Sequence, residues 1–462
     1  MTSENTSLNK GAVRPGLSTK WIYAIGQLGW SLTSFAAINL LPRFYFPPEE
    51  TGSTVFPEFI FTGAILGVLT TLGLVNFGGR IFDGITDPLI ANWSDRKSHK
   101  MGKRKFMMAL AIVPFALFSF LIFYPLSLDN FAINTTWLFI TLFLFFFSMT
   151  LYVVPYTALI GELGHHKDDR LSISTIISVT WALGFMIGNS IYAVFEFLQG
   201  SYEIVVAFQL AIGGFTIIGF LAMLVPILFL NENKYAVQQV AKINILESLK
   251  TVFSNRKFKI FAISDLFYWL SLTFIQTGIS FFITILVRRP ESDATSFLLI
   301  GFVCSLLLYL PLNILAKDVG KKKILLWAFA AFAVCFLLIA NYHHLGDGNL
   351  PFYSLAVISA FPLAAFGILP NAIIADIIYE DDNAESQTLA GMFYGARNFM
   401  MKMGVALANL IFPSLLILGK SSSNPRGIIL IAYVAVFFCL VGFLVFRKYE
   451  EKTLKVIKPL DN

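Results

Sequence analysis

Long apolar segments alternate with short polar segments along the whole chain. Most of the apolar segments have about 20 or more residues, which is enough for a helix to cross roughly 30 Å of hydrocarbon. The pattern is therefore typical of an all-α membrane protein. It predicts twelve membrane-spanning helices, at 20–46, 58–91, 106–126, 136–162, 171–196, 205–230, 259–287, 295–316, 324–341, 350–378, 387–418 and 427–446.

The polar segments contain a repeat that divides these helices into two sets of six. The loop between the second and third predicted spans carries Asp95-Arg96-Lys97 and then Gly102-Lys103-Arg104-Lys105. The loop between the eighth and ninth carries Lys317-Asp318 and then Gly320-Lys321-Lys322-Lys323. Two unrelated basic loops could look alike, but the shared position indicates two homologous halves.

This division predicts the organisation of the chain. Apolar residues at helical spacing in 236–250 predict a helix that lies on the membrane surface within the linker. We expect a polar tail at 1–19, an N-terminal six-helix bundle at 20–230, a linker at 231–258, a C-terminal six-helix bundle at 259–446 and a second tail at 447–462.

Composition and charge agree with a membrane protein. The chain is 56% hydrophobic and 13% charged, whereas a soluble domain has roughly 25% charged residues. If both termini are cytoplasmic, most of the 34 Lys and Arg residues fall on the cytoplasmic side, as in proteins of a cytoplasmic (inner or plasma) membrane. The net charge of +6 then reports topology and a preference for anionic lipid, and we expect no nucleic-acid partner.

Two aspartates within the second predicted span are the first candidates for chemistry. Asp83 and Asp87 are one helical turn apart, so their Cβ atoms lie about 6 Å from each other on one face. A carboxylate at the bilayer centre costs roughly 2.5–3.5 kcal/mol, so the pair needs a compensating partner. With the Thr86 hydroxyl, the oxygens suit Na⁺ or Li⁺; alternatively one carboxylate carries H⁺, or Arg80 forms a fixed salt bridge.

Basic residues in the eleventh predicted span form a second group. Lys402 has apolar neighbours on both sides, which favours pairing with the Asp83/Asp87 site or a bound substrate, although its ammonium could also snorkel to the interface. Arg397 lies nearer the cytoplasm. It either takes part in transport or neutralises Asp376 or Glu380.

Several further polar residues are candidates for lining or gating a path. Thr150 precedes the Val154-Pro155 dipeptide, which predicts either freed carbonyls or a plain kink. Asp265 is expected to cap or gate. We predict a charged gate that sets four carboxylates, Asp95, Glu162, Asp168 and Asp169, against Arg96, Arg170 and the linker lysines.

The Arg-x-x-Asp-x-x-x-Asp-Pro element at Arg80–Pro88 resembles that of the glycoside-pentoside-hexuronide:cation symporters. These are the melibiose-permease branch of the major facilitator superfamily. The acidic segment 375–381 and Lys402 match as well. The resemblance implies the major facilitator fold, with twelve helices in two halves around a central cavity. It places a cation site on Asp83, Thr86, Asp87 and Thr150, with Thr86 standing where the melibiose type has an amide.

The sugar site of that family is not reproduced. Ser31 stands where those permeases have an aspartate in the first helix, and Val153 and Thr157 replace an aspartate and a tryptophan in the fourth. Ser178 replaces an arginine in the fifth. Together with Asn398, these residues predict a weakly polar, neutral pocket, and relatives in the same branch resemble lysophospholipid carriers.

These observations predict a symporter that uses Na⁺ or H⁺ to move a small organic solute. The resemblance favours a sugar or glycoside, and the neutral pocket leaves an amphiphile such as a lysophospholipid as the alternative. The chain lacks cysteine metal motifs and a nucleophile motif, so we expect no enzyme and no cofactor beyond the coupling ion. The expected partners are the solute, the cation and the bilayer, and the protein is expected to be a monomer.

Overall fold

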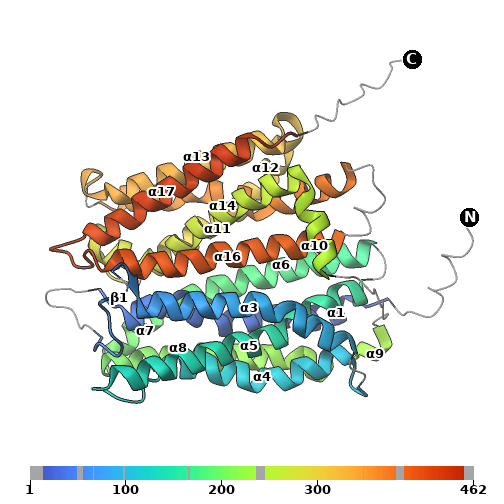
Figure 1. The fold of residues 1–462 in the computed structure, drawn as a ribbon, viewed down its shortest axis with the longest axis horizontal. Coiled ribbons are helices and arrows are strands. Elements are labelled where there is room, and N and C mark those ends of the chain that lie inside the picture. The colour runs from blue at the N-terminus through green and yellow to red at the C-terminus, as the bar shows by residue number, and fades with distance from the viewer. Residues whose placement is uncertain are drawn as a thin grey trace, which may run out of the picture. The chain divides into compact units, whose positions relative to one another are not determined.

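The computed structural model describes residues 14–48, 56–65, 67–96, 99–164, 167–235, 245–346, 348–380 and 390–451. Over these residues the protein is almost entirely helical (Figure 1). The chain forms two compact units. Unit 1 comprises Met1–Lys242, Gln276–Ser296 and Asn409–Gly427, and unit 2 comprises Ile243–Ile275, Phe297–Ala408 and Ile428–Asn462.

Unit 1 is built on long helices from the N-terminal half of the chain. Within it, α1 packs against α6 and α8, and α5 packs against α3 and α4. Its elements are α1 (Leu17–Asn39), α2 (Leu41–Tyr45), β1 (Ala64–Ile65), β2 (Leu69–Thr70), α3 (Thr71–Arg96), α4 (Lys103–Leu121), α5 (Phe131–Leu163), α6 (Lys167–Asn189), α7 (Ile191–Gln199), α8 (Ile204–Phe229), α9 (Glu232–Tyr235) and η1, a π-helix at Phe282–Val287.

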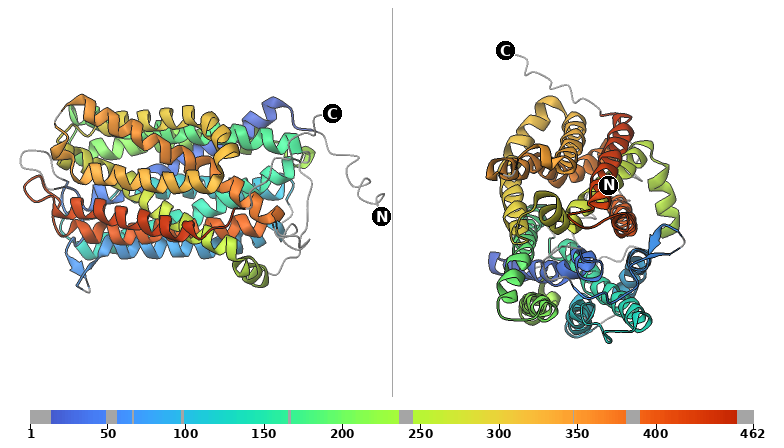
Figure 2. Two further views of the ribbon diagram at one scale, coloured as in Figure 1. Left: turned by 90° about the horizontal axis from the view of Figure 1, so that it is seen from above. Right: turned by 90° about the vertical axis from the view of Figure 1, so that its left-hand side faces the viewer.

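Unit 2 contains most of the C-terminal half, in which α13 packs against α14 (Figure 2). Four of its helices, α11, α12, α16 and α17, have one end in unit 1. Its elements are α10 (Ile245–Ser254), α11 (Arg256–Phe281), α12 (Asp293–Val319), α13 (Lys321–Ala340), η2 (Tyr342–His344), α14 (Asn349–Glu380), α16 (Ala390–Leu416) and α17 (Arg426–Arg447).

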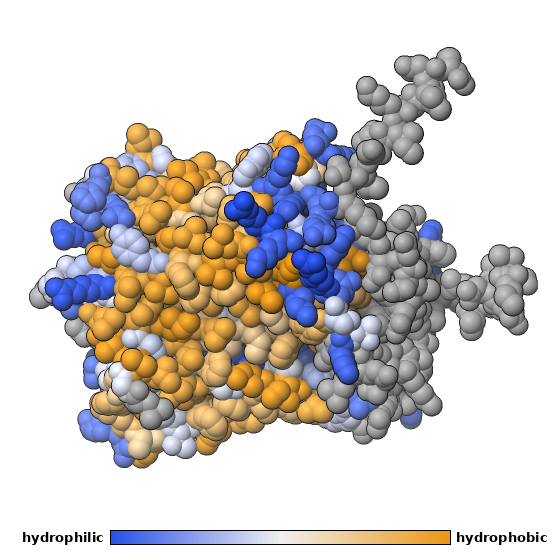
Figure 3. Space-filling view, turned by 45° about the horizontal axis from the view of Figure 1, so that its top comes forward, coloured by the Kyte–Doolittle hydropathy of each residue, from blue (hydrophilic) through white to orange (hydrophobic). Residues whose placement is uncertain are grey.

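Ten helical segments of the described chain are long and apolar enough to cross a membrane, and they correspond to the third through twelfth predicted spans. On the face drawn in Figure 3, apolar residues cover the middle of the helices and hydrophilic residues gather toward their ends. The helices α1 and α3, with 23 and 26 residues, have the length of a span but a more polar composition. An all-α membrane protein is therefore confirmed, and ten of the twelve predicted spans meet both criteria.

The first two predicted spans are shorter than expected. The helix predicted at 20–46 ends at Asn39, and the short helix α2 follows with Pro42 in its first turn, where the missing N–H is tolerated. The helix predicted at 58–91 begins at Thr71. Before it, β1 and β2 form a short antiparallel pair, with Gly67 at φ 85° in the turn, a conformation that glycine adopts readily.

The helix α5 contains Pro155 within its length, which is compatible with both alternatives predicted there, freed carbonyls or a plain kink. One further expectation about helix boundaries needs correction. The predicted surface helix at 236–250 lies partly outside the described residues, whose α10 runs from Ile245 to Ser254. The next helix begins at Arg256 rather than 259.

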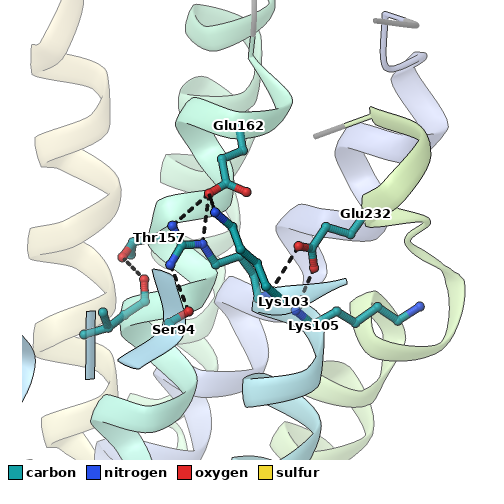
Figure 4. A network of polar contacts seen from close by, with 8 residues as sticks. Ser94, Lys103, Lys105, Thr157, Glu162 and Glu232 are labelled. Carbon is teal, nitrogen blue, oxygen red and sulfur yellow. Dashed lines mark hydrogen bonds and ion pairs between the residues drawn. The ribbon is translucent and has the colours of Figure 1, made fainter. Parts of the chain in front are cut away.

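The two repeated basic loops have the same geometry. Gly102 precedes α4 with φ 102° and ψ 146°, and Gly320 precedes α13 with φ 93° and ψ 147°. The Glu232 carboxylate accepts hydrogen bonds from two backbone N–H groups at the start of α4 (Figure 4), and Glu451 does the same at the start of α13. Each glutamate follows the last long helix of its half, so the repeat extends to the way these helices are capped. Burial raises the pKa of the Glu232 carboxyl above its usual range, and these hydrogen bonds oppose that shift.

Candidate functional site

The predicted aspartates lie where α3 packs closely against α5. Gly79 makes this approach possible, because a Cβ at this position would lie 2.7 Å from the Phe146 ring of α5. One turn further along α3, Asp83 is 0% exposed and Thr86 is also buried. Asp87 is half-buried. The packing thus removes the first carboxylate from solvent and leaves the second partly accessible.

Hydroxyl groups from both helices contact Asp83. The Thr150 hydroxyl on α5 donates a hydrogen bond to Asp83 Oδ1 at 2.7 Å, and the Thr86 hydroxyl donates to the Asp83 carbonyl oxygen at 3.1 Å. Three of the four predicted cation-site residues therefore lie in direct contact. Carboxylate and hydroxyl oxygens are hard donors, which alkali cations prefer.

Arg80 adds a positive charge to this cluster. Its Nη1 atom lies 3.8 Å from Asp83 Oδ2, and its guanidinium lies 4.8 Å from the centre of the Phe146 ring. The predicted contact between Arg80 and Asp83 is thus present, at a distance too long for a strong hydrogen bond. Arg80, Asp83 and Asp87 together carry one net negative charge when ionised, which a single monovalent cation would neutralise.

The predicted substrate residues in unit 1 are neutral, and several bond locally. Ser31 accepts a hydrogen bond from Gln27 Nε2 at 3.0 Å, and Thr157 donates to the carbonyl oxygens of Val153 and Val154. Ser178 donates to the carbonyl oxygen one turn earlier in α6. Such hydroxyls keep free lone pairs, so they can still accept a hydrogen bond from a solute.

On α6, Ser178 belongs to an exposed face with mixed chemistry. Ser174, Ser178 and Trp181 are exposed at helical spacing, and Trp181 stacks on Phe185 with ring centroids 5.8 Å apart. A second exposed face of the same helix carries Thr175 and then the apolar residues Val179, Leu183 and Ile187. The apolar face suits lipid, and the serine-bearing face suits water or a solute.

In unit 2, Arg397 has a different partner from the expected one. Its Nε atom donates to Asp265 Oδ2 at 2.9 Å, and its Nη1 atom donates to Asn371 at 2.8 Å. Asp376, one of its two expected partners, pairs with Lys321 instead. Asp265 is 2% exposed and lies inside α11, so it does not cap that helix, and Arg397 compensates its charge in the interior. Its gating role stays a prediction.

The remaining predicted residues of this region lie on α16. Lys402 is half-buried and Asn398 is exposed. Their roles in coupling and substrate binding stay predictions.

The predicted gate residues have partners within unit 1. Glu162 pairs with Arg104 at 2.8 Å and with Lys103 at 3.5 Å, both from the start of α4 (Figure 4). Asp169 pairs with Lys20 at 2.9 Å and with Arg14 at 3.1 Å. These partners differ from the expected set, and a gating role stays a prediction. The side chains of the other four residues lie outside the described part of the structure: Asp95, Arg96, Asp168 and Arg170.

One long-range ion pair escaped the sequence analysis. Arg43 in α2 pairs with Glu291, between η1 and α12. Arg43 lies near the end of the first predicted span and Glu291 in a short segment between two later ones, and the sequence gives no indication that these segments meet. Their only signal is an isolated charge at the end of an apolar run.

Comparison with known proteins adds the family. A model of the MFS/sugar transport protein family matches residues 23–450. The chain belongs to this family. Similar proteins include the "Putative glycoside/cation symporter YagG" of Escherichia coli (strain K12), 20% identical over 92% of this chain and 88% of its own length. The isoprimeverose transporter of Lactiplantibacillus pentosus is 23% identical, over 96% and 91%.

A third relative is named for the transport of a lipid rather than a sugar. The sodium-dependent lysophosphatidylcholine symporter 1 of Xenopus tropicalis is 22% identical over 83% of this chain and 82% of its own length. Among solved structures, the nucleoside transporter NupG aligns with a TM-score of 0.64 at 14% identity, covering 94% of this chain and 99% of its own. This likeness confirms the major facilitator fold, and the named relatives agree with the predicted melibiose-permease branch.

Proposed function

We propose that this protein is a symporter that uses Na⁺ to move a sugar or glycoside across a membrane by alternating access. The observation that carries the proposal is the buried carboxylate of Asp83, which contacts a hydroxyl from a second helix at 2.7 Å. Burying a carboxylate within a membrane protein costs free energy, and such residues usually have a functional role in ion or substrate pathways. Relatives named as a glycoside/cation symporter and a sodium-dependent symporter support ion coupling as that role.

Four residues would hold the ion: Asp83, Asp87, Thr86 and Thr150. Bound there, the ion supplies the positive charge that balances the cluster. The residues around it orient the oxygens: Gly79 allows α5 to approach, and Arg80 offsets one of the two carboxylates. The Thr150 hydroxyl at the Asp83 carboxylate and the Thr86 hydroxyl at its backbone carbonyl add oxygen ligands. These oxygens favour Na⁺ over H⁺, because binding a proton requires only one carboxylate oxygen.

The solute is expected to be neutral. The predicted substrate positions in unit 1, Ser31, Val153, Thr157 and Ser178, carry no charge. A sugar or glycoside fits this chemistry through hydrogen bonds, and relatives named for glycoside and isoprimeverose transport support it. A lysophospholipid is the second candidate, supported by the relative named for sodium-dependent lysophosphatidylcholine symport.

The distribution of charged residues and the family indicate the membrane location and orientation of the protein. We place it in a cytoplasmic membrane with both termini in the cytoplasm, because that orientation puts most Lys and Arg residues on the cytoplasmic side. We further propose that it works as a monomer, with no cofactor beyond the ion and no enzymatic activity.

Ion binding can be tested without knowing the solute. We expect the detergent-solubilised protein to melt at a higher temperature in NaCl than in choline chloride of equal ionic strength, because a ligand of the folded state stabilises it by mass action, by about 2.7 kcal/mol at 100 times Kd. Asp83→Asn should lose this shift, whereas Asp129→Asn, in an exposed loop, should keep it. Equal melting temperatures of the wild type in both salts would contradict Na⁺ coupling.

A further inference from the structure

The end of α1 leads into α2, where Arg43 forms an ion pair with a residue 248 positions later. Its Nε and Nη2 atoms donate to Glu291 Oε1 and Oε2, each at 2.7 Å. The two residues are 8% and 9% exposed. A bidentate pair of this kind is short, directional and shielded from solvent, unlike the surface pairs whose net contribution is small.

Aromatic packing fixes Arg43 on its side of the pair. The guanidinium lies 5.4 Å from the centre of the Phe56 ring. The next residue, Phe44, stacks on Phe59 and Phe208 with ring centroids 5.1 and 5.3 Å apart. Because these rings are fully or almost fully buried, α2 and Arg43 have little freedom to move relative to α8.

Backbone geometry fixes Glu291 on the other side. The π-helix η1 follows α11 and ends at Val287, and the next residue is Arg288, a non-glycine residue with φ 57°. The left-handed conformation turns the chain back on itself, and the Ser280 hydroxyl on the preceding helix then donates to Glu291 Oε1. Such a strained residue persists only where surrounding contacts hold it, and the contacts of Glu291 do so here.

The segments 276–296 and 409–427 make other contacts with the N-terminal helices inside unit 1. The backbone N–H of Ser292 donates to Glu196 of α7 at 2.8 Å, and the Thr295 hydroxyl donates to the Asn189 carbonyl oxygen at 2.8 Å. Asn409 Nδ2 donates to Asn76 Oδ1 of α3 at 3.4 Å, and both side chains are 2% exposed. These contacts add hydrogen bonds within unit 1, one to the Glu196 carboxylate and two between neutral groups, and the neutral ones are individually weak.

A carrier that works by alternating access must separate these segments from the N-terminal helices when that end of the protein opens. The segments include one end each of α11, α12, α16 and α17, whose remaining lengths lie in unit 2. Separation breaks the Arg43–Glu291 pair and requires both charges to be hydrated, because a buried charge without its partner is costly.

We propose that Arg43 and Glu291 form a latch that holds this end of the protein closed and thereby sets the balance between its open and closed states. The proposal rests on the transport function but not on the identity of ion or solute. Both residues act on the conformational step, and neither is expected to contact the solute.

Cysteine labelling tests the latch. In a background with Cys304, Cys335 and Cys439 replaced by serine, Asn409→Cys reports opening, because this side chain is buried against Asn76. We expect Arg43→Gln and Glu291→Gln each to raise its labelling rate by a water-soluble maleimide at least tenfold. The double variant Arg43→Glu/Glu291→Arg should return the rate to near that of the wild type.

Two controls separate opening from unfolding. Ser119→Cys, buried between α4 and α8 within the N-terminal helices, should stay slow to label in every variant. Arg289→Gln removes a partly exposed pair with Asp293 at the same end and should leave the Asn409→Cys rate unchanged. Unchanged labelling in both single variants would overturn the latch.

If the single variants unfold and Ser119→Cys also labels quickly, the charge-swapped double variant decides. Slow labelling at both reporters would support the latch, and fast labelling at Asn409→Cys would overturn it. Since neither Na⁺ nor sugar is present in the assay, a failure of this proposal is distinguishable from a failure of ion-coupled transport.

Discussion

The contact between Thr150 and Asp83 gives the most specific prediction about single residues. Thr150→Val keeps the shape of the side chain but removes an oxygen ligand, so we expect the Na⁺ concentration for half-maximal thermal stabilisation to rise about tenfold, equivalent to about 1.4 kcal/mol. Thr150→Ser should stay close to the wild type. Thr141→Val is the matched control, because Thr141 is equally buried in α5 and bonds only to its own helix among the described contacts. Equal effects of the two valine variants would indicate a structural role.

The site residues differ in how well the sequence could identify them. Asp83, Asp87 and Thr86 share one helix, so their proximity follows from helical spacing. Thr150 was assigned to the site from the family resemblance. It lies 67 positions from Asp83 on another helix, so helical spacing alone could not predict their contact. The partners of Arg397 and Glu162 depended on which helix ends meet, and the sequence does not determine this by any local rule.

Among the elements, the two capped basic loops are the clearest sign of the internal repeat. We expect Glu232→Ala and Glu451→Ala each to destabilise the protein by about 0.5–2 kcal/mol, because each removes a carboxylate that accepts two N–H groups at a helix start. Thermal unfolding in detergent measures the effect. Glu450→Ala, at the exposed neighbouring position, should cost far less, and a loss as large as that of Glu451→Ala would refute the cap.

Helix existence was predicted better than helix boundaries. Apolar length identified the ten spans from α4 to α17. It failed at 58–70, where the residues are as apolar as a span but two of them, Gly63 and Gly67, favour a turn. It also failed at Leu40, because Pro42 starts a new helix rather than interrupting the old one.

At the scale of the whole molecule, the family and the fold are consistent with the sequence pattern. Two sets of helices with a repeated loop predicted a major facilitator, and the match over residues 23–450 agrees. The boundary between the two compact units differs from the boundary between the two repeated halves of the sequence. The segments 276–296 and 409–427 belong by sequence to the C-terminal half but pack in unit 1, which is the basis of the latch.

The central claim is that a cation gradient drives uptake through Asp83. The most direct measurement is the accumulation of radiolabelled glucosides, galactosides, xylosides and lysophosphatidylcholine by proteoliposomes with an inward Na⁺ gradient. We predict that the wild type concentrates at least one of them above equilibrium, that monensin abolishes this, and that Asp83→Asn, although inserted and folded, never exceeds equilibrium. Normal accumulation by Asp83→Asn, or accumulation by the wild type that is indifferent to the Na⁺ gradient, would contradict the account.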